Sequence, residues 1–177
     1  MTEFELGILD KIQKLFGSPF GDRFFPAITS LGDAGMIWIA FILILITIPH
    51  TRKMGYVAAV SLILEAVVCN LILKPMVGRI RPCDVAEGIQ MLIPRPADYS
   101  FPSGHTAASF SVASSLLFCK SKLGIPTLIL AVLIAFSRLY LYVHFPSDVL
   151  TGALIGTASG FLAWYCKIST GEKRNSA

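Results

Sequence analysis

Three short polar motifs stand at the ends of apolar stretches, and their residue types suit chemistry on a phosphate. Lys74 and Arg81-Pro82 form the pattern K-x6-R-P, residues 102–105 read P-S-G-H, and residues 137–148 contain S-R-x5-H-x3-D. Together the motifs supply cations, two imidazoles and one carboxylate. Cationic side chains bind phosphate oxygens through charge-assisted hydrogen bonds, and a neutral imidazole can act as a nucleophile. The combination predicts a site that binds a phosphate and attacks it.

The cations of these motifs are the predicted phosphate ligands. Arg81 and Arg138 can each offer two parallel N–H donors, whereas Lys74 offers a compact point charge. A single cation at a helix end commonly extends toward the membrane surface without a ligand, but three beside histidine motifs favour an anion site. Pro75 and Gly78 interrupt the helix between Lys74 and Arg81, so the fold must bring these two cations together.

The P-S-G-H motif precedes an apolar segment and is typical of a helix start. Ser103 suits the N-cap position, and Gly104 allows a ligand to approach the backbone amides closely. The N-terminus of a helix attracts anions through its unpaired amides and its dipole. The motif therefore predicts an anion cradle with His105 beside it. An ordinary helix cap with a partly exposed histidine remains an equal alternative from these four residues alone.

His144 and Asp148 form the predicted reactive pair, four residues apart across Pro146. Asp148 would accept a hydrogen bond from one ring nitrogen of His144, which leaves the other nitrogen free to attack. Taken singly, Asp148 could instead complement a helix dipole, and His144 could be an aromatic residue of the membrane interface. The presence of Arg138 six residues before His144 favours the catalytic interpretation.

The composition of the chain indicates what kind of domain positions these residues. The chain has 177 residues, a hydrophobic fraction of 54%, a charged fraction of 15% and a mean hydropathy of +0.69. These values indicate one integral membrane domain over residues 1–177. The net charge of +4 comes without a basic face rich in aromatics, which argues against nucleic-acid binding. The four cysteines show no C-x-x-C spacing, so neither a zinc knuckle nor a disulfide framework is expected.

Hydropathy predicts an all-α, polytopic membrane helical bundle with six helices in total. A spanning helix needs about 20 mostly apolar residues. Five segments approach this length: 27–48, 54–74, 104–120, 124–143 and 147–166. Residues 4–17 place apolar side chains at helical spacing between charged ones, so the segment 1–22 is predicted to lie in the interface as an amphipathic helix.

Loop charge predicts the orientation of the chain in the plasma membrane. With five spans, one side of the membrane receives a group of basic residues, namely Arg52, Lys53, Lys120, Lys122, Lys167, Lys173 and Arg174. By the positive-inside rule this side, with the C-terminus, is cytoplasmic. The segment 1–22, the loop 75–103 and all three motifs then fall on the extracytoplasmic side.

The three motifs, in this order and spacing, resemble those of the type 2 phosphatidic acid phosphatase superfamily, and the hydropathy is similar to its small bacterial membrane members. The resemblance implies that His144 is the nucleophile and forms a phosphohistidine, that Asp148 orients it, and that His105 protonates the leaving group and then activates water. The implied phosphate-binding residues are Lys74, Arg81, Ser103, Gly104 and Arg138. No metal and no cofactor is implied.

Two other functions are possible besides that of a lipid phosphatase. A lipid transporter or flippase could use the same basic site to bind headgroups, and Glu65 inside a predicted span supports this alternative. A metal triad of His105, His144 and Asp148 is disfavoured because neighbouring cations would repel the ion. The sequence leaves the substrate open among undecaprenyl pyrophosphate, phosphatidylglycerophosphate, phosphatidic acid and diacylglycerol pyrophosphate. It also leaves open the oligomeric state and whether the segment 83–101 is a lid.

Overall fold

A computed structural model describes residues 2–86 and 88–175, and every regular element within these ranges is helical. The predicted all-α class is thus confirmed. The α-helices are α1 (Thr2–Phe16), α2 (Gly21–Leu31), α3 (Met36–Thr47), α4 (Arg52–Ala66), α5 (Lys74–Val77), α6 (Pro82–Val85), α7 (Gly104–Phe118), α8 (Gly124–Tyr140) and α9 (Pro146–Asn175). A 3-10 turn at Asp33–Gly35 and a π-helix at Val67–Leu73 connect some of them.

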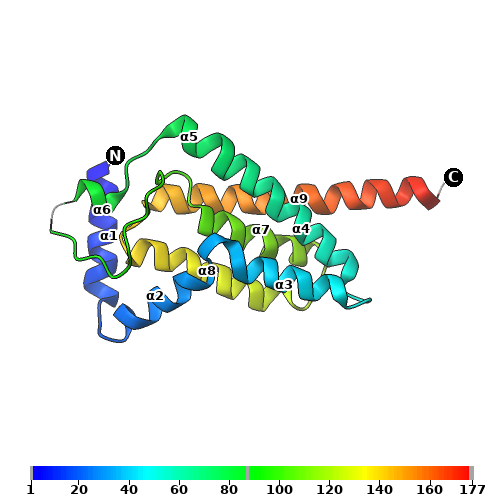
Figure 1. The fold of residues 1–177 in the computed structure, drawn as a ribbon, viewed down its shortest axis with the longest axis horizontal. Coiled ribbons are helices and arrows are strands. Elements are labelled where there is room, and N and C mark those ends of the chain that lie inside the picture. The colour runs from blue at the N-terminus through cyan, green and yellow to red at the C-terminus, as the bar shows by residue number, and fades with distance from the viewer. Residues whose placement is uncertain (1, 87, 176–177) are drawn as a thin grey trace.

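The bundle has two distinct ends (Figure 1). The helix α1 and the loop 78–103 lie at one end, here called the loop end, and the C-terminal part of α9 reaches the other end. The helix α3 runs away from the loop end and α4 returns to it, after which α7, α8 and α9 pass back and forth. The starts of α7 and α9 and the last turn of α8 therefore meet at the loop end.

The helix α7 is the centre of the bundle and packs against α4, α8 and α9. Ten of its fifteen residues are buried, and most of these are Ala, Ser or Thr. Small side chains of this kind let helix backbones approach closely inside a membrane protein. The serine hydroxyls are bonded within the bundle, for example Ser111 Oγ to the Ala108 carbonyl at 2.9 Å.

The contact between α7 and α9 depends on three glycines, one per helical turn. A Cβ atom added at Gly152 would lie 2.6 Å from the Ser103 carbonyl oxygen, and one at Gly156 would lie 2.3 Å from that of Ala107. The third glycine, Gly160, faces Ser114 in the same way. This face of α9 therefore holds the start of α9 against the start of α7. The H-x3-D motif thus lies beside the P-S-G-H motif.

The first predicted span, 27–48, is divided in the structure. The chain leaves helical geometry at Ala34 (φ 49°) and Gly35 (φ 68°), and the helices on the two sides meet at a bend of 43°. Gly35 adopts this left-handed conformation readily because it has no Cβ atom. The expectation of one continuous helix here was wrong, since the apolar composition hides a turn at Gly32–Gly35. The turn places Asp33 at the loop end.

The helix α1 crosses the loop end of the bundle (Figure 1). Its inner face buries Leu9 completely, and its Gln13 side chain donates a hydrogen bond to the Tyr140 carbonyl at 3.0 Å. Phe4 and Leu15 are about three-quarters exposed. The predicted helix at residues 4–17 is therefore present, and its exposed apolar side chains suit a position in the interface.

Helix length and hydropathy support a membrane protein without fixing the number of spans. The stretches Arg52–Val85 and Pro146–Cys166 are each long and apolar enough to cross a bilayer, with mean hydropathies of 2.2 and 1.4. The bent pair Gly21–Leu31 and Asp33–Thr47 passes the same test jointly. Within the described residues α7 and α8 are shorter, at 15 and 17 residues. The five-span topology therefore stays a prediction.

Candidate active site

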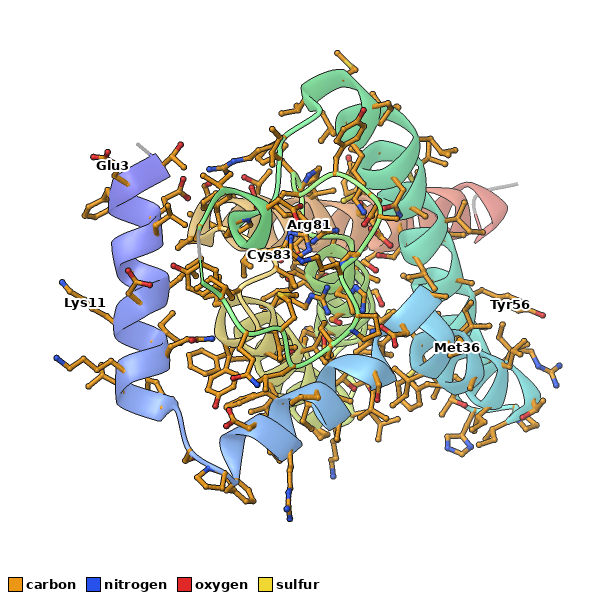
Figure 2. The ribbon with its side chains drawn as sticks, turned by 60° about the vertical axis from the view of Figure 1, so that its left-hand side comes forward. Glu3, Lys11, Met36, Tyr56, Arg81 and Cys83 are labelled. Carbon is orange, nitrogen blue, oxygen red and sulfur yellow. The ribbon has the colours of Figure 1, made fainter. Side chains whose placement is uncertain are left out.

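A cavity of about 420 Å³ opens at the loop end, among the ends of α7, α8 and the loop 78–103. Six of the predicted site residues line it: Lys74, Arg81, Gly104, His105, Arg138 and His144. The two other predicted residues, Ser103 and Asp148, are fully buried beside this cavity. Figure 2 looks toward this end of the bundle and places Arg81 near its centre, whereas Lys11 points outward from α1 and Tyr56 outward from α4.

Arg81 is held from several sides. It precedes α6 in an extended conformation (φ −77°, ψ 153°), and only 3% of its surface is exposed. Its Nη1 donates to the Val143 carbonyl at 2.7 Å and lies 3.2 Å from Nε2 of His144, while its Nε donates to the Asp98 carbonyl at 2.9 Å. The structure thus places a guanidinium beside the histidine nitrogen that is predicted to attack.

Arg138 reaches the cavity from the last turn of α8. It is 3% exposed, and its Nη1 donates to Oγ1 of Thr29 at 2.5 Å. Its buried Nε has no hydrogen-bond partner within the described part of the chain. A buried N–H without a partner costs free energy, so a bound anion would stabilise this arginine.

Lys74 completes the set of cations from a third direction. It follows the π-helix and begins α5, and Gly78 ends that turn in a left-handed conformation (φ 59°). The break between Lys74 and Arg81 is therefore present as predicted. Both side chains form ion pairs with the carboxylate of Asp98, which was not a predicted site residue.

The helix α7 begins at the P-S-G-H motif as predicted, but the Ser103 side chain does not cap it. Ser103 is the N-cap residue, yet its hydroxyl pairs with Oγ1 of Thr106 at 2.9 Å and makes no cap hydrogen bond. Its amide donates to the Asp148 carbonyl at 3.1 Å. Gly104 lines the cavity, and a Cβ atom there would lie 3.1 Å from Oδ1 of Asn70 and 3.7 Å from Nζ of Lys74. The bare backbone of Gly104, more than the Ser103 hydroxyl, is available to an anion.

His144 lies in the short connection between α8 and α9, outside the helices, and is 1% exposed. Burial, followed by the positive charges of Arg138 and Arg81, lowers its pKa to about 3 even though Asp148 acts in the opposite direction. The imidazole is therefore neutral near pH 7. Neutrality is what a nitrogen nucleophile requires.

The expected hydrogen bond between His144 and Asp148 is not formed in this structure. Nδ1 of His144 lies 3.7 Å from Oδ2 of Asp148, which is longer than a hydrogen bond. Asp148 instead accepts hydrogen bonds from Arg79 Nη1 at 2.6 Å, Ser100 Oγ at 2.5 Å and the Phe145 amide at 2.9 Å. These donors fix the carboxylate directly behind the imidazole.

Arg79 links this carboxylate to the N-terminal helix. Its Nη2 donates to Oε2 of Glu5 at 2.6 Å, and its guanidinium carbon lies 3.9 Å from the centre of the Phe145 ring. The other Glu5 oxygen accepts from the Ser147 amide at 3.0 Å. Sequence reasoning missed Arg79 and Glu5, although the position of Arg79 inside the K-x6-R-P motif could have drawn attention to it.

His105 has a carboxylate partner of its own. Its Nε2 lies 2.9 Å from Oδ1 of Asp33, which stands in the turn that divides the first span. A Cβ atom at Gly32 would come within 2.8 Å of the His105 ring, so this glycine makes room for the pair. Asp33 was also missed. A charged residue inside a predicted span was the available sequence evidence for it.

Comparisons with known proteins identify the family of the chain. The family model described as the PAP2 superfamily matches residues 52–170, which contain all three motifs. The chain belongs to the PAP2 superfamily. The crystal structure of Aquifex aeolicus LpxE superposes with a TM-score of 0.76 at 30% identity, covering 89% of this chain and 93% of that one. A PAP2-type phosphatidylglycerolphosphate phosphatase from Bacillus subtilis superposes with a TM-score of 0.75 at 26% identity, covering 94% and 86%.

Curated members of the PAP2 superfamily are similar in sequence as well. An undecaprenyl-diphosphatase of Sulfolobus acidocaldarius is 35% identical over 72% of this chain, and the match spans 62% of that protein's length. A lipid A 4'-phosphatase of Bacteroides thetaiotaomicron is 35% identical over 84% of this chain and 70% of its own length. Both relatives are named for phosphate removal from a lipid, but for different lipids.

Proposed function

We propose that this PAP2 protein is a metal-independent membrane phosphatase that hydrolyses a lipid phosphate or pyrophosphate through a phosphohistidine. The observation that carries the proposal is the convergence of three cations on a cavity beside a buried, neutral His144. Such a cavity neutralises the charge of a phosphoryl group and presents a nucleophile to it. The names of the relatives support a lipid as the substrate.

The proposed reaction has two steps. First, Nε2 of His144 attacks phosphorus, the bond from phosphorus to the leaving oxygen breaks, and protonated His105 gives that oxygen its proton. Then His105 takes a proton from water, the resulting hydroxide attacks phosphorus, and the phosphorus–nitrogen bond breaks to release inorganic phosphate. Lys74, Arg81, Arg138 and the Gly104 backbone would stabilise the phosphoryl oxygens throughout.

Asp148 and Asp33 take supporting roles in this mechanism. Asp148, held by Arg79 and Ser100, would stabilise the His144 imidazole as positive charge develops on it during attack. The 3.7 Å separation would need to shorten by a small rotation of the ring. Asp33 would stabilise the protonated form of His105, the form that donates to the leaving oxygen.

The proposed setting is the plasma membrane, with the site on the extracytoplasmic side and the C-terminus in the cytoplasm. The start of α4 and the connection between α7 and α8 lie away from the loop end (Figure 1), and they carry Arg52, Lys53, Lys120 and Lys122. The positive-inside rule places that end in the cytoplasm. A reporter that works only in the cytoplasm should be active when fused after Lys173. Activity there of a reporter that works only outside the cytoplasm would reverse the proposed orientation.

Phosphate release from lipid phosphates in detergent, with a chelator present, tests the activity. The wild-type protein should release phosphate, and His144→Ala should lower kcat by at least about a thousandfold, since the nucleophile is absent. A matched control is His50→Ala, because His50 lies between α3 and α4 at the other end of the bundle. Normal activity of His144→Ala would exclude the phosphohistidine. Transport of lipid across vesicles without phosphate release would favour the transporter alternative.

A further inference from the structure

A second cavity, of about 500 Å³, adjoins the phosphate site. Lys74, Asp98, Gly104 and His105 line both cavities. The second one extends along α4 to Leu62 and Ile63 and across to Ile39 at the start of α3. Ile39 is 47% exposed and Ile63 is 63% exposed, so this cavity connects the phosphate site with the apolar outer surface between α3 and α4.

The wall of the second cavity carries a buried carboxyl group that the proposed chemistry does not use. Glu65 lines this cavity from the last turn of α4, and only 2% of its surface is exposed. Its Oε2 is buried and has no hydrogen-bond partner within the residues that the structure describes. A buried polar oxygen without a partner is costly in an apolar bundle, and intramembrane ionisable residues commonly mark functional sites.

Asn70 supplies a second polar group on the same wall. It lies in the π-helix Val67–Leu73, and π-helical turns are frequent at functional sites. Its Oδ1 approaches the backbone of Gly104, at the edge shared by the two cavities. Glu65 and Asn70 therefore both line the second cavity, with Asn70 at the edge that it shares with the phosphate site.

The position of His105 assigns this cavity to one part of the substrate. In the proposed function, on which this inference rests, His105 protonates the oxygen that leaves phosphorus. The group attached to that oxygen must then lie on the His105 side, and the second cavity is lined by His105 whereas His144 lines only the first. The second cavity is therefore the place of the leaving group.

We propose that the second cavity binds a leaving group that bears a hydroxyl close to the scissile phosphate, as a glycerol or a sugar does, and that Glu65 with Asn70 hydrogen-bonds this hydroxyl. A hydroxyl can donate to the Glu65 carboxyl and accept from the Asn70 amide. A plain prenyl chain would leave Glu65 without a partner. A prenyl diphosphate would place its second phosphate near a carboxyl group. The protein would thus select its lipid substrate by a hydroxyl group of the headgroup.

Kinetics on matched lipids test this assignment. Purified protein in detergent would be assayed with phosphatidylglycerophosphate, with its analogue that lacks the free headgroup hydroxyl, with a lipid-linked sugar phosphate and with a prenyl diphosphate. Wild-type protein should show a kcat/KM roughly tenfold or more higher for phosphatidylglycerophosphate than for the deoxy analogue, the size expected when a missing hydroxyl leaves buried polar groups without a partner. The sugar phosphate distinguishes a glycerol site from a sugar site.

Variants of Glu65 make the test specific. Glu65→Leu should remove the preference for the hydroxyl while leaving kcat/KM for the deoxy analogue within about twofold, and Glu65→Gln should keep part of the preference because its amide still forms hydrogen bonds. Val60→Leu is the matched control, since Val60 is 48% exposed on the same helix and does not line this cavity. Leucine carries no buried polar atom that needs a partner, so the replacement should be tolerated in folding.

Three outcomes would overturn the assignment. The first is that the wild-type kcat/KM for phosphatidylglycerophosphate equals that for the deoxy analogue. This measurement needs no variant, so it decides the question even if Glu65→Leu fails to fold. The second is an equal loss on every lipid in Glu65→Leu and Glu65→Gln, which would mean that Glu65 supports the bundle only. The third is absence of phosphate release from all four lipids by the wild-type protein, which would also overturn the proposed function, whereas the first two outcomes would leave it intact.

Discussion

The carboxylate of Asp98 lies 2.5 Å from the Arg81 guanidinium, measured from Oδ1 to Nη2, and its other oxygen pairs with Lys74. Burial alone would raise the pKa of Asp98, but the hydrogen bonds and charges of Lys74 and Arg81 lower it to about 2. Asp98 is thus ionised at any pH near neutrality. It neutralises two of the cations that the proposed mechanism assigns to the phosphate, so substrate and Asp98 compete for them.

Replacement of Asp98 with asparagine should therefore strengthen anion binding. Without the carboxylate, Lys74 and Arg81 keep their full charge for a phosphate, and we expect inorganic phosphate or vanadate to inhibit at a concentration roughly threefold to tenfold lower. Inhibition constants for wild type and variant at fixed ionic strength measure this. Glu3→Gln is the control, because Glu3 is exposed on α1 and lines neither cavity. Weaker inhibition in Asp98→Asn would mean that Asp98 holds the cations in place.

The lowered pKa of His144 should make stability depend on pH. The pKa is about 3 in the folded protein and about 6.5 in the unfolded chain, so between these values the unfolded chain binds a proton that the folded protein does not. Stability is therefore unaffected above pH 6.5 and falls as the pH drops below it. For a shift of this direction and size, the free energy of unfolding at pH 5 is lower than at pH 7 by about 2 kcal/mol.

Thermal unfolding in detergent at pH 7 and pH 5 measures this effect. The midpoint of the wild type should fall between the two values by several degrees more than that of His144→Gln, because glutamine does not titrate. The His50→Gln variant, altered at the other end of the bundle, should behave like the wild type. An equal fall in wild type and His144→Gln would contradict the lowered pKa.

The motifs were predictable because the chemistry of a phosphate site restricts residue types, and helix ends restrict where polar residues can stand. Arg79, Asp33 and Asp98 escaped prediction because their roles are pairings between distant segments, which spacing does not reveal. Arg79, for instance, joins residues 5 and 148. The fold class followed from hydropathy, whereas the turn at residues 32–35 did not, since two short apolar helices and one long helix have similar composition.

Arg79 should be needed to position Asp148, without touching the substrate. Arg79→Gln removes the charge that fixes the carboxylate behind His144, and we expect kcat to fall about tenfold to a hundredfold with KM changed little. Arg79→Lys should restore part of the activity, since lysine can still pair with Asp148 or Glu5. Steady-state kinetics on one lipid phosphate measure both variants.

The N-terminal helix should contribute to the same positioning through Glu5. Glu5→Gln weakens the second ion pair of Arg79 and should lower kcat by a smaller factor, about threefold to tenfold. Lys11→Gln is the control on the same helix, because Lys11 points away from the bundle (Figure 2). An unchanged kcat in both Arg79→Gln and Glu5→Gln would show that Ser100 and the Phe145 amide suffice to hold Asp148.

The glycine face of α9 should be essential for the stability of the site end of the bundle. A methyl group at Gly156 would lie 2.3 Å from the Ala107 carbonyl oxygen, and this backbone atom can move only if α7 and α9 separate. Gly156→Ala should therefore destabilise the protein by about 1–3 kcal/mol, as overpacked sites do. It should also lower activity, because the separation pulls Asp148 away from Ser103 and the start of α7.

Gly7→Ala provides the matched control for this change. Gly7 lies inside α1, and a Cβ atom there meets nothing within 4 Å. Alanine favours a helix over glycine by about 1 kcal/mol, so this variant should unfold at the same temperature as the wild type or a higher one. Thermal unfolding in detergent compares the two variants directly. If Gly156→Ala unfolded at the wild-type temperature, the close approach of α7 and α9 would not be what holds the two motifs together.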